Sequence, residues 1–134
     1  MFRLIRRWRK NEKGQALVEL AVVLPVLLLL MFGIIEFGRI YGAYLNISSA
    51  AREAVRAGVV GATDSQMEAV VHSATAGLDG DSLTVNITPD ETLRKRGEQL
   101  KVHLGYNVKI YAPIISGIIG DPFPLAAETT MRVE

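Results

Sequence analysis

Residues 12–37 read EKGQALVELAVVLPVLLLLMFGIIEF, and this stretch decides how the rest of the chain can fold. Sixteen residues without a charge lie between Glu19 and Glu36. A membrane span usually needs roughly 20 apolar residues, and Gln15 to Phe37 is long enough if the two glutamates lie near the two membrane interfaces. The remaining chain is too small to enclose a helix that is apolar on every face. We therefore predict a membrane-spanning helix.

The charge of the chain is divided unevenly around this segment. The formal net charge is +1, but residues 1–14 carry six basic groups and one acid, so the remainder is acidic. A basic arm beside a membrane helix stays in the cytoplasm, and we expect the C-terminal part to lie outside the cytoplasmic membrane. The arm is short and abuts the span, which argues against nucleic-acid binding. The lack of cysteines excludes disulfides and thiol catalysis without indicating a compartment.

Helical spacing continues beyond the apolar segment, through EFGRIYGAYLNISSAAREAVRAG. The apolar run is long for a secretory signal peptide, and no small-x-small cleavage site follows it at the usual distance. We predict one helix over residues 15–58, about 65 Å long. Pro25 removes one of its hydrogen bonds and is expected to kink or loosen it, and Gly58 is the predicted stop.

The chain after Gly61 predicts a small outer domain over residues 59–134. Thr63 and Gln66 have the spacing of a capping box. They precede an amphipathic pattern that indicates a helix of about twelve residues. Gly77 is the predicted end of this helix.

Three later segments alternate apolar and polar residues, as half-buried strands do. They are residues 82–88, residues 99–111, where Pro113 is expected to end the strand, and residues 126–134. The apolar segment 114–123 is predicted to be a loop. Its apolar side chains either form an exposed patch that needs a partner, or the loop folds back on the sheet or dips to the membrane. Three antiparallel strands with one polar face, and one helix beside the long helix, make an α+β, pilin-like fold.

The N-terminal pattern resembles a known signal. Basic residues, then Gly14, QALVE and an apolar helix resemble the class III signal peptide of type IV pilins. The longer stretches GQALVELAVVLPVLLLLMFGIIEFGRIY and AAREAVRAG, with a C-terminal MRVE, resemble the TadE-like minor pilins (pseudopilins) of tight-adherence pili, the Flp-type or type IVc family. The resemblance covers residues 13–58 well and the last few residues loosely. It implies cleavage by a prepilin peptidase between Gly14 and Gln15, with other pilin or pseudopilin subunits as partners.

Glu19 would be the fifth residue of the processed chain. An ionised carboxylate in hydrocarbon is costly unless it finds a partner. Cleavage would create an α-amino group on Gln15, with an ordinary pKa near ~8, close to Glu19 on the same helix. The two groups could neutralise each other within one subunit or between neighbours during assembly. In the plainer interpretation, Glu19 only marks the membrane interface.

Glu36 and Arg39 form an i, i+3 pair of opposite charge at the expected outer membrane interface. The simplest interpretation is a surface pair whose long side chains reach the interface. The alternative is a role in lateral contacts between subunits.

No pattern in the chain indicates an enzyme, a cofactor, a metal site or a small-molecule substrate. His72 and His103 are isolated and are expected at the surface, and ordinary zinc-ligand spacing is absent. Asp79 and Asp81 lack the remaining ligands of a calcium loop and predict a turn. The basic run at residues 94–96 is expected to be a solvated connector, with an acidic partner as the alternative.

Two functional hypotheses remain. In the first, the chain is a cleaved minor pilin that contributes to pilus assembly, initiation or adherence. In the second, it is an uncleaved single-pass membrane anchor whose outer domain binds another secretion or pilus component. The N-terminus of the chain, Met1 or Gln15, separates them.

Overall fold

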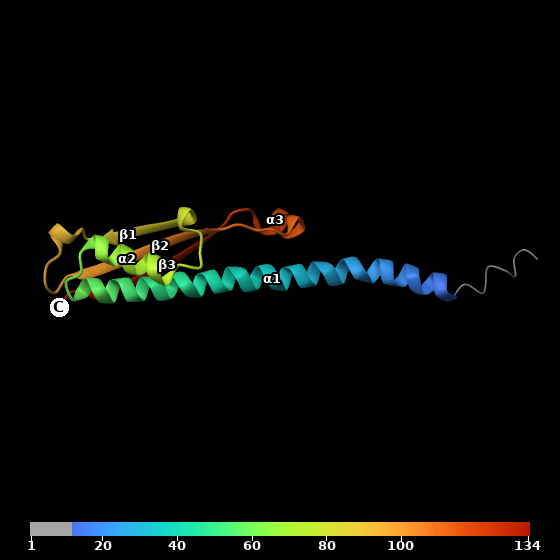
Figure 1. Cartoon of the computed structure of the whole chain (residues 1–134), viewed down its shortest axis with the longest axis horizontal. Coiled ribbons are helices and arrows are strands. Elements are labelled where there is room, and N and C mark those ends of the chain that lie inside the picture. The colour runs from blue at the N-terminus through green and yellow to red at the C-terminus, as the bar shows by residue number, and fades with distance from the viewer. Residues whose placement is uncertain (1–11) are drawn as a thin grey trace, which may run out of the picture.

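The computed structural model describes residues 12–134 as one long helix with a small α+β layer on its C-terminal half (Figure 1). Helix α1 (Glu12–Val59) has 48 residues and continues through Pro25 as one element, so it is about 72 Å long. Two 3₁₀ turns interrupt the chain after it, at Gly80–Ser82 and Glu91–Leu93. The other elements are α2 (Asp64–Ala74), β1 (Leu83–Thr88), β2 (Gln99–Val108), α3 (Pro113–Ile119) and β3 (Phe123–Arg132). The predicted α+β class is confirmed.

The sheet is an antiparallel meander in the order β1-β2-β3. Its register places Val85 opposite Leu104, and Leu104 opposite Ala127. Alternate residues are half-buried along β1, and buried or half-buried along β2 and β3, because successive side chains of a strand point to opposite faces. The prediction of one apolar and one polar face is therefore confirmed.

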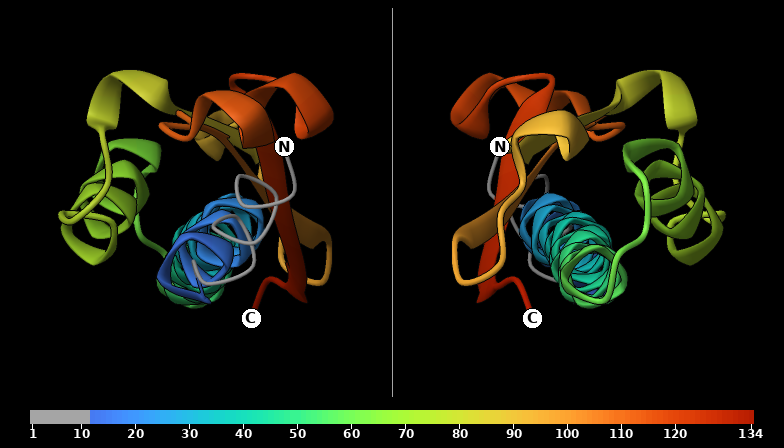
Figure 2. Two further views of the ribbon diagram at one scale, coloured as in Figure 1. Left: turned by 90° about the vertical axis from the view of Figure 1, so that its right-hand side faces the viewer. Right: turned by 90° about the vertical axis from the view of Figure 1, so that its left-hand side faces the viewer.

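Helices α1 and α2 pack against the apolar face of the sheet. Seen end-on, α1 lies between α2 and β3 (Figure 2). The part of α1 under the sheet is rich in alanine, whose small side chain lets the helix approach the strands closely. The shared core consists of Ile47, Ala50, Ala51, Ala54, Val55 and Val59 of α1, Met67 and Val71 of α2, Leu100, Val102 and Leu104 of β2, and Ala127 of β3.

The end of α1 is set by Gly61, and the prediction that Gly58 is the stop was wrong. Gly61 has a φ of 102°. Its N–H donates to the Gly58 carbonyl at 3.1 Å, and the Ala62 N–H donates to the Ala57 carbonyl at 3.1 Å, which is the Schellman pattern of helix termination. Gly58 has a different role, because a Cβ there would lie 2.5 Å from Leu100 Cδ2.

Helix α2 begins as predicted and ends earlier than predicted. The Thr63 hydroxyl accepts the Gln66 N–H at 3.3 Å, and the Gln66 side chain accepts the Thr63 N–H at 3.0 Å, so the capping box is confirmed. The helix ends at Thr75, whose hydroxyl and N–H both donate to the Val71 carbonyl. Gly77 lies beyond this end and is not the stop.

The apolar segment 114–123 is not a loop, contrary to the prediction. It forms α3 and, at its last residue, the start of β3. Strand β2 ends at Val108, residues 109–112 have no regular structure, and Pro113 begins α3 instead of ending a strand. Proline fits the first helical position because its missing N–H has no helical partner there. Gly120, with a φ of 88°, ends the helix.

Candidate functional site

The amino-terminal half of α1 projects beyond the sheet and α2 (Figure 1). It is long and apolar enough to cross a membrane, and its most apolar stretch is not buried within the structure. Water disfavours an apolar surface of this size, so another medium or another helix must cover it. The exposed large apolar side chains here are Leu17, Val18, Leu20, Val22, Val23, Leu24, Val26, Leu27, Leu28, Leu29, Leu30, Met31, Phe32, Ile34, Ile35 and Phe37.

The predicted processing and pairing residues lie on the first turns of this half. Gly14 and Gln15 are inside α1, which begins at Glu12. Gln15 and Glu19 are four residues apart and both are exposed, so they lie on the same face one helical turn apart. Their roles in cleavage and charge pairing stay predictions.

Glu36, at the other end of the apolar segment, is buried with only 4 % of its surface exposed. One carboxylate oxygen, Oε1, accepts the N–H groups of Tyr111 at 2.8 Å and Ala112 at 2.9 Å. The other oxygen accepts Arg39 Nη1 at 2.6 Å. The ion pair expected from the sequence is therefore present. Its interpretation as a simple surface pair was wrong, because the carboxylate binds backbone about 75 residues away.

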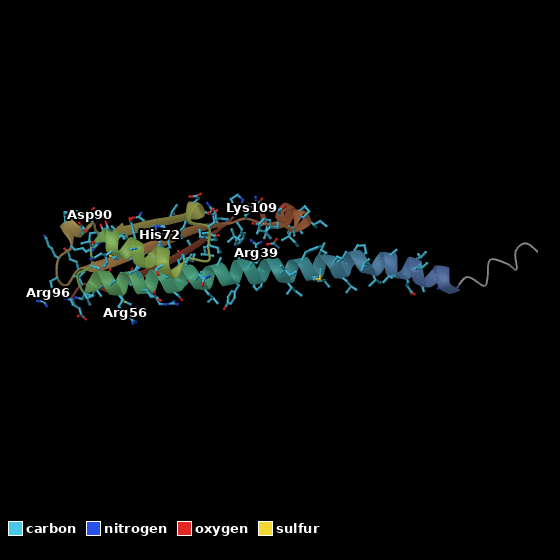
Figure 3. All side chains as sticks on the ribbon, viewed as in Figure 1. Arg39, Arg56, His72, Asp90, Arg96 and Lys109 are labelled. Atoms are coloured by element: carbon cyan, nitrogen blue, oxygen red, sulfur yellow. The ribbon has the colours of Figure 1, made fainter. Side chains whose placement is uncertain are left out.

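Cationic and aromatic groups gather around this carboxylate. Arg39 Nη2 also donates to the Lys109 carbonyl at 3.2 Å, and the guanidinium lies 4.4 Å from the centre of the Tyr111 ring. The Lys109 ammonium lies 5.8 Å from the same ring. Figure 3 shows Arg39 and Lys109 at one level of the molecule, between the sheet and α3. We call Glu36, Arg39, Lys109 and Tyr111 the Glu36 junction.

The Glu36 junction holds the irregular segment 109–112 against α1. Asp121 assists, because its carboxylate accepts the Ile110 N–H at 3.0 Å. This role of Glu36 was not predicted from the sequence. A signal existed, since Glu36 is the only acidic residue of the helix between Glu19 and Glu53, and an acid in that setting needs a partner.

Arg94 is not part of a solvated basic run, contrary to expectation. Its side chain is 8 % exposed and forms an ion pair with Asp64 at the start of α2. The guanidinium also donates to the carbonyls of Ala62 at 3.0 Å and Pro89 at 3.2 Å. Arg94 thereby joins the α1–α2 connection to the β1–β2 connection. The next two residues of the run are exposed, as predicted.

The polar groups considered for a metal site have structural explanations. Asp79 accepts the Asp81 N–H at 3.2 Å and begins a 3₁₀ turn, so the predicted turn is confirmed. His72 is exposed on α2, and His103 lies 3.5 Å from the Glu128 carboxylate on the polar face of the sheet. A hydrogen bond from the neighbouring lysine of that face lowers the pKa of Glu128. Within residues 14–134, no three metal-ligating side chains lie together.

Comparison with known protein families gives a match within α1. Residues 14–56 match the family model described as TadE-like protein. The match begins at Gly14, contains Glu19 and Glu36, and ends before the outer layer. No curated protein and no solved structure matches the chain. Over this helix, about a third of the chain, the protein is similar to the TadE-like protein family.

Proposed function

We propose that the chain is a minor pilin, or pseudopilin, of a tight-adherence (type IVc) pilus system in the bacterial cytoplasmic membrane. One observation carries the proposal. The family match covers a helix whose first half exposes apolar side chains and whose second half is the core of a small domain. A subunit that passes from a membrane into a helical filament needs this division, because its bare half must be covered first by lipid and then by other subunits.

In this function the basic arm stays in the cytoplasm, and the sheet, α2 and the C-terminus lie outside. The support is the excess of basic residues before α1 and of acidic residues after it. The protein is then a single-pass membrane protein before assembly. Its partners are the prepilin peptidase, the cytoplasmic membrane and other pilin or pseudopilin subunits.

Processing occurs between Gly14 and Gln15. A glycine before the cut fits a narrow peptidase site and is also the weakest helix former of this turn. That second property matters because the bond lies inside α1 and must leave the helical conformation to be cut. The new amine would then stand at the positive end of the helix, where the Glu19 carboxylate is favourable.

The test of processing is the mass of the protein extracted from membranes. We expect the parent chain to begin at Gln15, and Gly14→Ile to leave it beginning at Met1. Gly38→Ile is the matched control, because no atom lies within 4 Å of a Cβ at that position, and it should be processed normally. A Gly14→Ile protein that still begins at Gln15 would contradict the proposal.

The test of Glu19 is association with partner pilins. Glu19→Ala should insert and be cleaved, since an apolar residue replaces a costly one. Crosslinked co-purification with partner pilins should fall sharply, because the Gln15 amine loses its counter-charge at a cost of several kcal/mol. Glu19→Gln should recover little, and Glu53→Gln, on the outer half of α1, should associate normally. Full association of Glu19→Gln would exclude charge pairing.

The second candidate function is an uncleaved membrane anchor whose outer domain binds another secretion or pilus component. The observation that favours it is the helical conformation of residues 12–15, which presents no extended substrate to a peptidase. In that case the extracted parent chain begins at Met1. Gly14→Ile then also begins at Met1 and associates as the parent chain does.

A further inference from the structure

Helix α3 lies beside the membrane segment of α1 instead of beside the sheet (Figure 1). Ile115 Cδ1 lies 3.9 Å from where a Cβ of Gly33 would be. An apolar groove between the two helices is lined from Pro25 to Phe32 on α1 and by residues 112–115. Leu28, in this groove, is eight residues before Glu36, or about 12 Å along the helix axis.

This distance is slightly shorter than the thickness of one leaflet of the hydrocarbon core. The hydrocarbon core is ~30 Å thick, so one leaflet contributes about 15 Å. If Glu36 marks the outer interface, as the proposed topology requires, α3 reaches into the outer leaflet.

The composition of α3 suits that environment. Residues 112–120 read APIISGIIG and contain no charge. Ile115 points inward and packs against the small core cluster formed with Val108. Ile114 and Ile118 point outward and are 61 % and 71 % exposed. An isoleucine surface of this kind is unfavourable in water and favourable in lipid.

The backbone N–H groups that precede α3 have hydrogen-bond acceptors within the protein, as a segment in lipid requires. In hydrocarbon every backbone N–H must find a partner within the protein, and irregular backbone is tolerated only where it does. The N–H groups of residues 110, 111 and 112 are all accepted by carboxylates, from Asp121 and Glu36. On a wet surface, water would serve these groups and no buried glutamate would be needed.

The Glu36 junction supplies the matching boundary. Arg39, Lys109 and Tyr111 surround the carboxylate where the segment leaves the sheet. Tyrosine is enriched at the headgroup level of membranes, and basic groups near a membrane are attracted to anionic lipids. In the proposed orientation, the Glu36 junction lies at the outer membrane interface, and the apolar side chains of α3 lie deeper in the membrane.

We propose that α3 inserts into the outer leaflet beside α1 and that lipid acyl chains cover its exposed isoleucines. The protein then contacts the membrane through a helix and a half-depth wedge, which limits rotation of the outer domain about α1. The inference rests on the proposed membrane-spanning role of α1. It concerns a part of the chain outside the residues that match the TadE-like family.

The experiment uses the full chain, which has no cysteine of its own, in vesicles of phosphatidylethanolamine and phosphatidylglycerol. Single cysteines replace Ile118 on α3, Ile34 in the span and Leu93 on the β1–β2 connection. All three native side chains are similarly exposed, at 71 %, 73 % and 66 %. A fluorophore on each cysteine reports quenching by lipids that carry a nitroxide on the acyl chain. A water-soluble maleimide reports access from water.

We expect Ile118→Cys to behave like Ile34→Cys, with strong quenching by the acyl-chain nitroxide. Its reaction with the maleimide should be at least about tenfold slower than that of Leu93→Cys, because each unit of upward pKa shift in an apolar environment removes about nine-tenths of the thiolate. Leu93→Cys should be unquenched.

Three outcomes would overturn the inference. Ile118→Cys could match Leu93→Cys while Ile34→Cys is quenched, in which case α1 spans and α3 stays in water. Ile118→Cys could escape both reagents and form a disulfide between copies, in which case protein covers α3. Finally, Ile34→Cys could be unquenched. That result would show that α1 does not span the membrane, and α3 could then not insert beside it.

Discussion

At the scale of single residues, Glu36 accepts two backbone N–H groups. In an exposed irregular segment, water would be their acceptor. Gly58 contributes through the absence of a side chain, which leaves room for the neighbouring residues. Met67 Sδ and Leu100 Cδ2 would both lie 2.5 Å from a Cβ at that position. Both residues decide how closely segments distant in sequence approach α1.

Replacing Glu36 should weaken the attachment of residues 109–112. In Glu36→Ala, the N–H groups of Tyr111 and Ala112 and the Nη1 atom of Arg39 lose their acceptor, and we expect the free energy of unfolding to fall by about 3 kcal/mol. Glu36→Gln keeps one acceptor oxygen and should cost about 1–2 kcal/mol. Denaturant unfolding of the full chain in detergent micelles measures both. Glu53→Gln, an exposed glutamate of the same helix, is the control, and equal stability of Glu36→Ala and this control would refute the assignment.

Gly58→Ala should destabilise the protein although alanine is the better helix former. The overlap with Leu100 and Met67 forces the helix and the sheet apart, and overpacking of this kind costs about 1–3 kcal/mol. Gly38→Ala has open space around it and should raise stability by up to about 1 kcal/mol. Thermal unfolding of the two variants provides the comparison. If Gly58→Ala proves as stable as Gly38→Ala, the packing at this contact is looser than described.

At the scale of elements, connections are held by side chains that come from other segments. The cap of α2 is local, since Thr63 and Gln66 supply it themselves. The connection between β1 and β2 instead depends on Arg94, which reaches Asp64 at the start of α2 and the carbonyl of Ala62. Segment 109–112 depends in the same way on α1. These contacts determine how the elements are placed relative to one another.

Arg94→Ala should loosen the end of the molecule where α1, α2 and the β1–β2 connection meet. Removing one partner of a largely buried ion pair leaves the Oδ1 atom of Asp64 and two carbonyls without the guanidinium donor, and we expect a loss of about 2–4 kcal/mol. Arg94→Lys should recover only part of it, because lysine cannot reproduce the planar fork of donors. Arg96→Ala, at an exposed position of the same run, should change stability by less than about 0.5 kcal/mol. Equal unfolding midpoints for Arg94→Ala and Arg96→Ala would show that the contact contributes nothing.

At the scale of the whole molecule, α1 has two surroundings along one axis. Its second half forms the core with the sheet and α2, and its first half has α3 and the end of segment 109–112 beside it. Burial of the second half fixes the direction in which the first half projects. A domain fixed in this way would hold its polar sheet face and C-terminus on one side of a membrane.

Topology should follow the basic arm. A reporter enzyme active only outside the cytoplasm, fused after Glu134, should be active in the parent chain. Added protease should digest the outer domain in spheroplasts. Changing the six basic residues of the arm to glutamine should lower reporter activity, because the charge bias that orients the helix is removed. Glutamine at Arg52 and Arg56 is the control, since these lie on the far half of α1. Protection of the outer domain from protease would reverse the proposed orientation.

The sequence by itself determined the features that depend on neighbouring residues. The apolar run and its helical continuation predicted α1, the Thr63 and Gln66 spacing predicted the cap of α2, and alternation predicted the three strands. Each of these patterns acts over one or two turns or along one strand. The match to the TadE-like family model likewise lies within one continuous helix.

Only the tertiary structure decided what the ambiguous segments do. The run 114–123 carries no period that separates a buried helix from a loop, so its identity as α3 and its place beside α1 came from contacts with Gly33 and the small core cluster. Glu36 and Arg94 appeared to be surface charges because their acceptors and donors lie far along the chain. Gly58 appeared to be a helix stop because glycine permits both a turn and a close approach. Choosing between these two uses requires knowing that Leu100 and Met67 lie against that position, and no local pattern contains that information.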